Sequence, residues 1–193
     1  DGTNWSTGGN LPVSYAYATA VGTQNSVVQN GGYISPSTIA CSLAYDGVAW
    51  GFLTTSPACK FESGGGGTST SAFFASGGSP ASNSKTEMFD CTTSTCIGAW
   101  SFGGSLITAR CSAGGAGSQN AALVFGGRNP SDTNVSEAYN GSSFTAVASM
   151  INNGMMVGDA GTQNAALRFG GLPGAGCTEE YNGVGWSAGG NLI

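Results

Sequence analysis

The feature that most constrains this chain is a motif that recurs four times along its 193 residues. Each copy starts with a turn-like segment, runs through a short apolar stretch to a double glycine, and ends with two aromatic residues. The interval from the second aromatic of one copy to the next turn glycine is 17 residues every time (5 to 22, 50 to 67, 100 to 117, 144 to 161). An interval kept four times indicates an internal structural repeat.

The repeat predicts units of 42 to 50 residues, at about 6–50, 51–100, 101–144 and 145–186, with 1–5 and 187–193 as partial repeats. Each unit is expected to hold four short strands: one before the turn, one before the double glycine, one ending at the first aromatic and one beginning at the second. The last two are joined by Asn-Gly or Asp-Gly in three units. These dipeptides predict a type I′ hairpin turn, with positive φ at both central residues.

A four-stranded unit of this size cannot bury its own faces, so successive units must pack face to face. The two aromatic residues of each unit would fill the space between neighbours, and the glycine pairs would let backbones approach closely. The sequence therefore predicts an all-β fold: a β-propeller of four-stranded antiparallel blades. It is expected to form a single domain over residues 1–193, as part of a larger ring or array.

The pattern resembles the kelch-type propeller repeat, which also has an apolar run ending in a double glycine, followed by a Tyr and then a Trp. It lacks the charged positions usual in kelch repeats. Residues 161–192 are more similar to repeats of the form GTQNAAL-x-FGG…EEYNG-x-x-W-x-x-GGNL, found in large structural proteins of bacteriophages and environmental bacteria. This resemblance implies a structural role by analogy only, because a fold does not determine a function.

The same element occurs at both ends of the sequence. Residues 5–11 read Trp-Ser-Thr-Gly-Gly-Asn-Leu, and residues 186–192 read Trp-Ser-Ala-Gly-Gly-Asn-Leu. The chain therefore has five fourth-strand segments but four copies of the other three strands. Two interpretations stay open: the chain is a segment of a longer array, or the surplus strand pairs with another chain by strand addition.

Composition excludes several classes of function. Five Lys and Arg residues stand against ten Asp and Glu, which makes nucleic acid an improbable partner. Without any histidine, neither a Ser-His-Asp triad nor a histidine metal site can be built. No stretch of about 18 apolar residues is present, so no membrane insertion is expected. No cofactor is expected either.

Six cysteines allow 15 pairings. Cys91 and Cys96 are the first and last residues of a six-residue insertion in the second unit, and we expect a disulfide between them. The other four are Cys41, Cys59, Cys111 and Cys177. They are interpreted as buried thiols, with their pairing left open. A loop disulfide is typical of an extracellular or virion-exposed protein.

Because strands alternate in direction, the tight turns should gather on one face of the propeller and the longer links on the other. The second, variable face would carry residues 33–44, 79–88, 128–138 and 172–180, and variation on a fixed scaffold is typical of a binding surface. The candidate binding residues on this face are Tyr33, Asn129, Asp132, Asn134, Glu179 and Glu180.

Two carboxylate pairs lie in these stretches: Glu179 with Glu180, and Asp132 with Glu137. Paired carboxylates hydrolyse glycosides when they are held about 5–10 Å apart. The interpretation favoured by the sequence is nevertheless that these are solvated loop acids.

The sequence favours a non-enzymatic structural or adhesive propeller, located in a virion appendage or an extracellular assembly. Its expected partners are other protein subunits, including a second copy bound by strand addition. A carbohydrate-binding propeller that recognises a cell-surface glycan is the alternative, and a glycan-cleaving enzyme is a weaker third.

Overall fold

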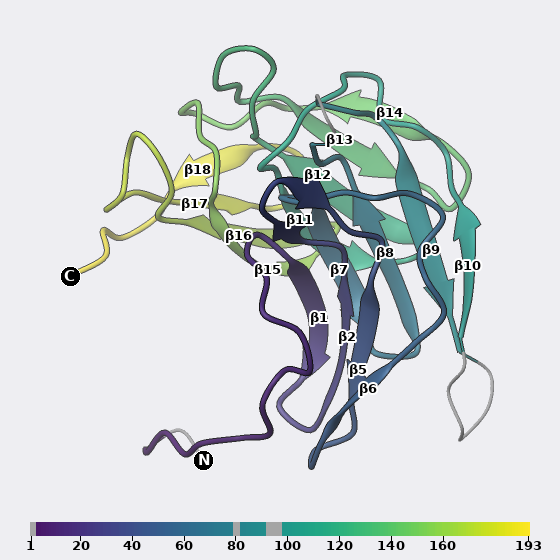
Figure 1. Cartoon of the computed structure of the whole chain (residues 1–193). Helices are drawn as coiled ribbons and strands as arrows, with labels where there is room; N and C mark the ends of the chain where they lie inside the picture. The colour runs from purple at the N-terminus through teal and green to yellow at the C-terminus, as the bar shows by residue number, and fades with distance from the viewer. Residues whose placement is uncertain (1–2, 79–81, 92–97) are drawn as a thin grey trace.

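The computed structural model describes residues 3–78, 82–91 and 98–193. These residues form an all-β protein in which four antiparallel four-stranded sheets follow one another as the blades of a propeller (Figure 1). The predicted fold class is therefore confirmed. The described residues contain no helix long and apolar enough to cross a membrane.

Blades 1 and 2 come from the first half of the chain. Blade 1 consists of β1 (Thr19–Thr23), β2 (Ser26–Asn30), β5 (Ser42–Tyr45) and β6 (Trp50–Phe52). The link between β2 and β5 carries a small extra pair, β3 (Tyr33–Ile34) and β4 (Ser37–Thr38). Blade 2 consists of β7 (Gly64–Thr68), β8 (Ser71–Ala75), β9 (Thr86–Asp90) and β10 (Ala99–Phe102).

Blades 3 and 4 repeat the same order without extra strands. Blade 3 consists of β11 (Gly114–Ser118), β12 (Ala121–Phe125), β13 (Ser136–Tyr139) and β14 (Phe144–Val147). Blade 4 consists of β15 (Gly158–Thr162), β16 (Ala165–Phe169), β17 (Thr178–Tyr181) and β18 (Trp186–Ala188). Within every blade each strand is hydrogen-bonded to the strand before it, which places the tight turns at one end and the longer links at the other.

The first strand of each blade lies at the centre, and three of these four strands approach each other through glycine. β7 lies against both β1 and β11, and β11 lies against β15. A Cβ atom added to Gly64 would lie 2.8 Å from the carbonyl oxygen of Gly114, and one added to Gly115 would lie 2.7 Å from the amide nitrogen of Gly65. Glycine is required here because the two backbones are in direct contact.

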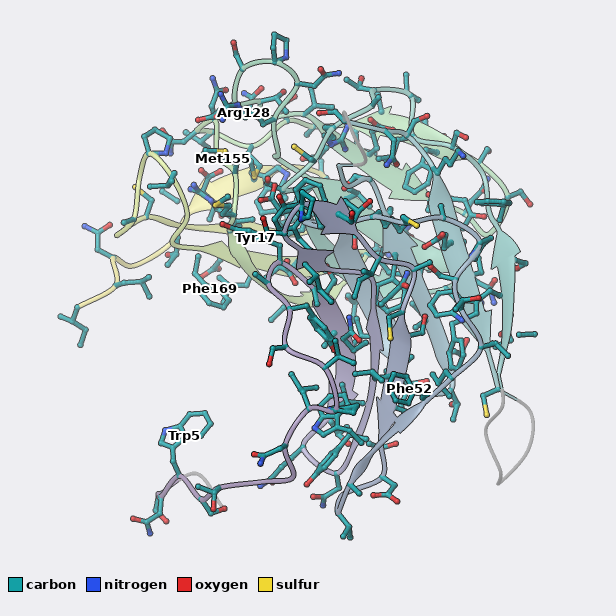
Figure 2. All side chains as sticks on the ribbon, viewed as in Figure 1. Trp5, Tyr17, Phe52, Arg128, Met155 and Phe169 are labelled. Carbon is teal, nitrogen blue, oxygen red and sulfur yellow. The ribbon has the colours of Figure 1, made fainter. Side chains whose placement is uncertain are left out.

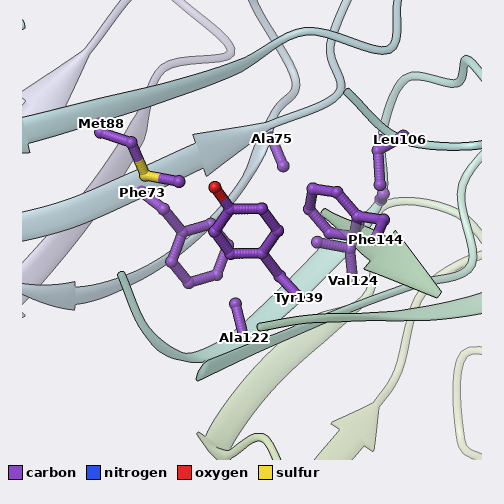
Figure 3. Close-up of a cluster of buried hydrophobic side chains, with 9 residues drawn as sticks. Phe73, Ala75, Met88, Leu106, Ala122, Val124, Tyr139 and Phe144 are labelled. Carbon is purple, nitrogen blue, oxygen red and sulfur yellow. The ribbon is translucent and has the colours of Figure 1, made fainter. Parts of the chain in front are cut away.

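The core lies between blades rather than within them. Figure 3 shows the layer between blades 2 and 3, where Phe73 and Met88 meet Tyr139 and Phe144. The rings of Tyr139 and Phe144 lie 4.7 Å apart. A second layer joins blade 1 to blade 2, and a third joins blade 3 to blade 4. The predicted role of the paired aromatic residues, filling the space between neighbouring units, is confirmed for the pairs of blades 2, 3 and 4.

Among the described residues, no buried hydrophobic layer joins blade 4 to blade 1. Leu123 and Phe125 of blade 3 are completely buried beneath blade 4. Leu167 and Phe169 occupy the same strand positions in blade 4 and are only half-buried. Figure 2 shows Phe169 on the open side of the molecule, which the N-terminal segment also borders.

The predicted type I′ turns are wrong. Gly47, Gly141 and Gly183 have positive φ, but the Asp or Asn before each does not. The strands pair so that four residues remain in each loop, as between Tyr139 and Phe144. Asn140 Oδ1 accepts hydrogen bonds from the amides of Ser142 and Ser143, at 3.0 and 2.9 Å. This side-chain cap of the loop replaces the two-residue turn.

The difference between the covered and the open blade face predicts a difference in stability. Phe125→Ala should lower the free energy of unfolding by about 3–5 kcal/mol, because it leaves a cavity between blades 3 and 4. Phe169→Ala should cost about half of that or less, because its ring is partly exposed. Urea unfolding of the two variants measures the difference, and equal losses would contradict the open face.

Candidate functional site

The most distinctive chemistry in the molecule is a buried ion pair that recurs in three blades. Each pair joins a glutamate on the third strand of a blade to a basic side chain of the same repeat unit. The pairs are Lys60 Nζ–Glu87 Oε2 at 3.2 Å, Arg110 Nη1–Glu137 Oε1 at 2.5 Å and Arg168 Nη1–Glu179 Oε1 at 3.2 Å. All six side chains are at most 1% exposed.

Each glutamate also fixes the link that enters its own blade. Glu137 accepts the amide protons of Ile107 and Thr108, and Glu179 accepts those of Ile151 and Asn152, at 2.7–3.2 Å. Glu87 accepts the amide proton of Ala58 at 2.8 Å. A carboxylate can serve both as an ion-pair partner and as an acceptor for backbone amides. The glutamate therefore anchors the inter-blade link to the sheet.

The basic partner comes from two different places. Lys60 and Arg110 stand seven residues before the turn glycine of their units. In blade 4 that position is Gly154, and the guanidinium comes instead from Arg168 on β16. A Cβ atom at Gly154 would lie 2.5 Å from Arg168 Nη2, so the glycine makes room for the relocated side chain.

Blade 1 has a neutral version of the same contact. Tyr15 stands at the position of Lys60, and its hydroxyl donates to Gln29 Oε1 at 2.8 Å. Burial raises the pKa of Tyr15 to about 12, with a smaller contribution from the nearby Cys41. The glutamate position is held by Leu43. The link carries Pro12, which has no amide proton to donate, but Pro57 stands at the same position in blade 2, so the proline is not specific to the neutral contact.

Burial also acts on the cation of blade 2. Removal of Lys60 from water lowers the pKa of its ammonium group, and the opposing effect of Glu87 is smaller. Lys60 Nζ also donates to the carbonyl oxygen of Phe74 at 2.7 Å. These contacts make Lys60 a structural cation rather than a free surface charge.

The candidate binding residues do not form one site. Glu179 is 1% exposed and belongs to the ion pair of blade 4, whereas its neighbour Glu180 is exposed on β17. Asn134 Nδ2 donates to the carbonyl oxygen of Met150, and Asn129 Nδ2 donates to that of Ala109. Asp132 lies in the same link of blade 3 as these two asparagines, and Tyr33 lies in blade 1 with its ring 5.8 Å from that of Phe61.

The interpretation of the paired carboxylates as solvated loop acids is wrong for Glu137 and Glu179. Both lie on third strands and are buried against a guanidinium. The signal that sequence reasoning missed is their spacing. Glu87, Glu137 and Glu179 each stand two residues before the first aromatic of their units.

Among the hollows on the described surface, two lie where residues of several blades meet. On the variable face, a hollow of about 400 Å³ lies between blades 3 and 4, lined by Ile151, Asn152, Asn153, Pro173, Gly174 and Cys177. On the turn face, a hollow of about 330 Å³ lies at the centre, lined by residues of the turns of blades 2 to 4, including Thr68, Ser118 and Gln163. Neither hollow has an aromatic side chain in its lining.

Cys41, Cys59, Cys111 and Cys177 are free thiols. Cys59 is exposed and the other three are half-buried, so the expectation of four buried thiols is only partly met. The predicted Cys91–Cys96 disulfide involves Cys96, which lies outside the described residues. In the part of the chain that is described, no group of three or more His, Cys, Asp or Glu residues is placed to hold a metal ion.

The ion pair predicts a strong coupling between its two members. Glu137→Leu should lower the free energy of unfolding by about 3–5 kcal/mol, because it leaves a buried guanidinium without a counter-charge. The double variant that also carries Arg110→Met should recover part of this free energy of unfolding. The part that is not recovered reflects the two link amides, which lose Glu137 as their hydrogen-bond acceptor. Denaturant unfolding of both single variants and the double measures the coupling, with the exposed Glu180→Gln as a control expected to stay within about 0.5 kcal/mol. Strictly additive losses would contradict the pair.

A carboxylate near the centre predicts a pH dependence. Asp159 Oδ2 accepts the amide proton of Gly115 at 3.1 Å, and burial raises its pKa to about 6. The folded protein then binds a proton more tightly than the unfolded chain does, so Asp159 lowers stability as the pH rises from about 4 to about 6. Asp159→Asn should remove this component. Urea midpoints measured across that range for both proteins test it, and parallel profiles would contradict it.

No known protein-family model matches this chain, and no curated protein is significantly similar to it. The four-blade propeller is therefore established by the structure itself, and the kelch-like and phage-like resemblances rest on the repeat residues alone.

Proposed function

We propose that this chain is a non-enzymatic structural propeller, a building block of an extracellular or virion assembly whose partners are other protein subunits. The observation that supports this proposal is the repeated buried ion pair. Three of the five Lys and Arg residues are locked into these pairs, together with three of the ten Asp and Glu residues. The scarce charge of the chain is used to hold links against sheets.

Burial of the carboxylates also supports a non-catalytic role. A glycoside hydrolase needs two carboxyl groups that both reach the substrate. In each candidate pair, one member is the buried partner of an arginine, Glu137 in one and Glu179 in the other. The resemblance of residues 161–192 to repeats of phage and bacterial structural proteins supports an extracellular or virion location by analogy.

Fractionation of the source material tests the proposal. An antibody raised against this chain should detect it in cell-free particles or in the extracellular fraction, within an assembly that survives high salt. Recovery of the chain only as a soluble intracellular species would overturn the proposal.

Glycan binding is a second candidate, favoured by the hollow between blades 3 and 4. Asn152 and Asn153 place two amide side chains at its edge, and amides are suited to sugar hydroxyls. Asn152 Nδ2 already donates to Glu179 Oε1 at 3.1 Å, which leaves Asn153 as the adaptable group.

A glycan array tests this candidate together with the enzymatic alternative. If the hollow binds a glycan, Asn153→Ala should abolish the signal and Asn164→Ala, on the opposite turn, should not. Turnover of any glycan on the array that is lost in Glu180→Gln would instead restore the hydrolase interpretation.

A further inference from the structure

The segment that follows each fourth strand holds two blades together. Between blades 2 and 3 it contains Gly103 and Gly104. The amide of Gly103 donates to the carbonyl oxygen of Thr86 in its own blade, at 2.9 Å. The amide of Gly104 donates to the hydroxyl of Tyr139 in the next blade, at 3.3 Å. A Cβ atom at Gly104 would lie 2.3 Å from the carbonyl oxygen of Ser142, so the glycine is pressed against the hairpin of that blade.

The two ends of the sequence each carry half of this arrangement. The amide of Gly189 donates to the carbonyl oxygen of Thr178 in its own blade, at 2.9 Å. Gly190, the counterpart of Gly104, has nothing within 4 Å of an added Cβ atom. Gly9 holds the position of Gly104 in the N-terminal segment. It lies against blade 1, where an added Cβ atom would be 2.8 Å from the carbonyl oxygen of Val48.

The N-terminal segment therefore occupies, on blade 1, the place that residues 189–190 would take on a following blade. The tryptophan of this segment packs on none of the four described blades. Trp5 is fully exposed and stands away from the body of the protein (Figure 2), whereas the ring of Trp186 lies 5.0 Å from that of Phe125.

The side of blade 4 that faces blade 1 has the same strand positions that the next blade covers in blades 1 to 3. On blade 4, Leu167 is half-buried, although its counterparts Val28, Phe73 and Leu123 are completely buried by the next blade. A shallow hollow on this face is lined by Ala160, Leu167, Glu180 and their neighbours.

The glutamines in the turns indicate an uncovered contact on blade 1, because in other blades they bind the preceding blade. Gln163 Nε2 donates back to the carbonyl oxygen of Tyr139 in the preceding blade, at 2.7 Å. Gln119 Nε2 likewise donates to Asp90 Oδ2 at 2.9 Å. Gln24 is their counterpart in blade 1 and is exposed. In a continued stack, Gln24 would reach the end of β17.

We propose that the partner of this chain is a second copy of itself, docked head to tail: the open face of blade 4 packs on blade 1 of the next copy, and residues 189–192, which follow β18, displace residues 8–11 from it. The two segments are interchangeable because they share Gly-Gly-Asn-Leu. This inference rests on the proposed function and names the partner. A head-to-tail contact is heterologous, so it builds a ring or a filament rather than a simple two-fold dimer.

Two glycine substitutions test the proposal with effects of opposite sign. Gly190→Val adds atoms in open space in the single chain but places them against Val48 in the docked pair, so it should abolish self-association and leave unfolding unchanged. Gly9→Val loosens the competing N-terminal segment, so it should strengthen self-association by a factor on the order of ten. Sedimentation equilibrium over a concentration series measures both.

Gly185→Val is the matched control, because Gly185 also has nothing within 4 Å of an added Cβ atom but lies in the hairpin of blade 4. It should associate like the unaltered chain. Phe169→Ser should also abolish self-association, because it removes an apolar ring from the face of blade 4 that docks on the next copy.

A chain that stays monomeric both unaltered and as Gly9→Val would overturn the proposal, and would indicate that other blades or another protein cover blade 4. Association that persists in Gly190→Val would overturn it as well. Either result leaves the fractionation experiment unaffected, since a monomer found in purified particles still serves a structural role.

Discussion

Direct contact between backbones at the centre of the propeller is the constraint on which the rest of this structure depends. β7 and β11 approach so closely that a single methyl group at Gly64 or Gly115 would meet backbone atoms of the other strand. Strands without side chains contribute little apolar burial, so the layers that stabilise the blades must lie farther out. That is where the aromatic pairs lie, as in the layer around Tyr139 and Phe144. The same closeness brings Asp159 beside the amide of Gly115, and so makes this carboxyl sensitive to pH.

The buried ion pairs solve a second problem, which is how to hold the links between blades. A buried pair often stabilises a fold no more than a hydrophobic replacement would, because both charges lose their hydration. Here each glutamate also accepts the amide protons of a link, which an apolar side chain cannot do. Blade 1 shows what accompanies the loss of the charge. Leu43 replaces the glutamate and Tyr15 replaces the cation, so the contact that remains is the neutral hydrogen bond from Tyr15 to Gln29. The pairs thus define the path of the backbone.

Much of the fold is readable from the sequence, because its signals are periodic and local. The constant interval of 17 residues and the aromatic pairs were sufficient to predict four blades, each of four antiparallel strands. The hairpin type was mispredicted because Asn140 caps a longer loop with its side chain, a choice that the dipeptide alone does not reveal.

The candidate site was harder to predict, because its chemistry depends on contacts between strands. Glu137 and Arg110 are 27 residues apart in the sequence and meet only when β13 pairs with its neighbours. In blade 4 the cation comes from β16 and not from the link before the first strand, so a search for a fixed Arg-to-Glu spacing would miss Arg168. The open face of blade 4 could not be predicted either. Leu123 and Leu167 both stand in Gln-Asn-Ala-Ala-Leu-x-Phe-Gly-Gly, yet the first is completely buried and the second is half-buried.

The relocated arginine of blade 4 has a consequence for how such arrays grow. Arg168, its partner Glu179 and the glycine that accommodates it all lie within residues 145–186, just as Arg110 and Glu137 lie within 101–144. Each of these repeats therefore contains both members of its buried ion pair. Duplicating or deleting a whole repeat would separate no buried ion pair, whereas a recombination point between the two members of a pair would separate them. The segments within which a gene for such a protein can lengthen or shorten without breaking an ion pair are thus those that follow one glutamate and precede the next basic partner.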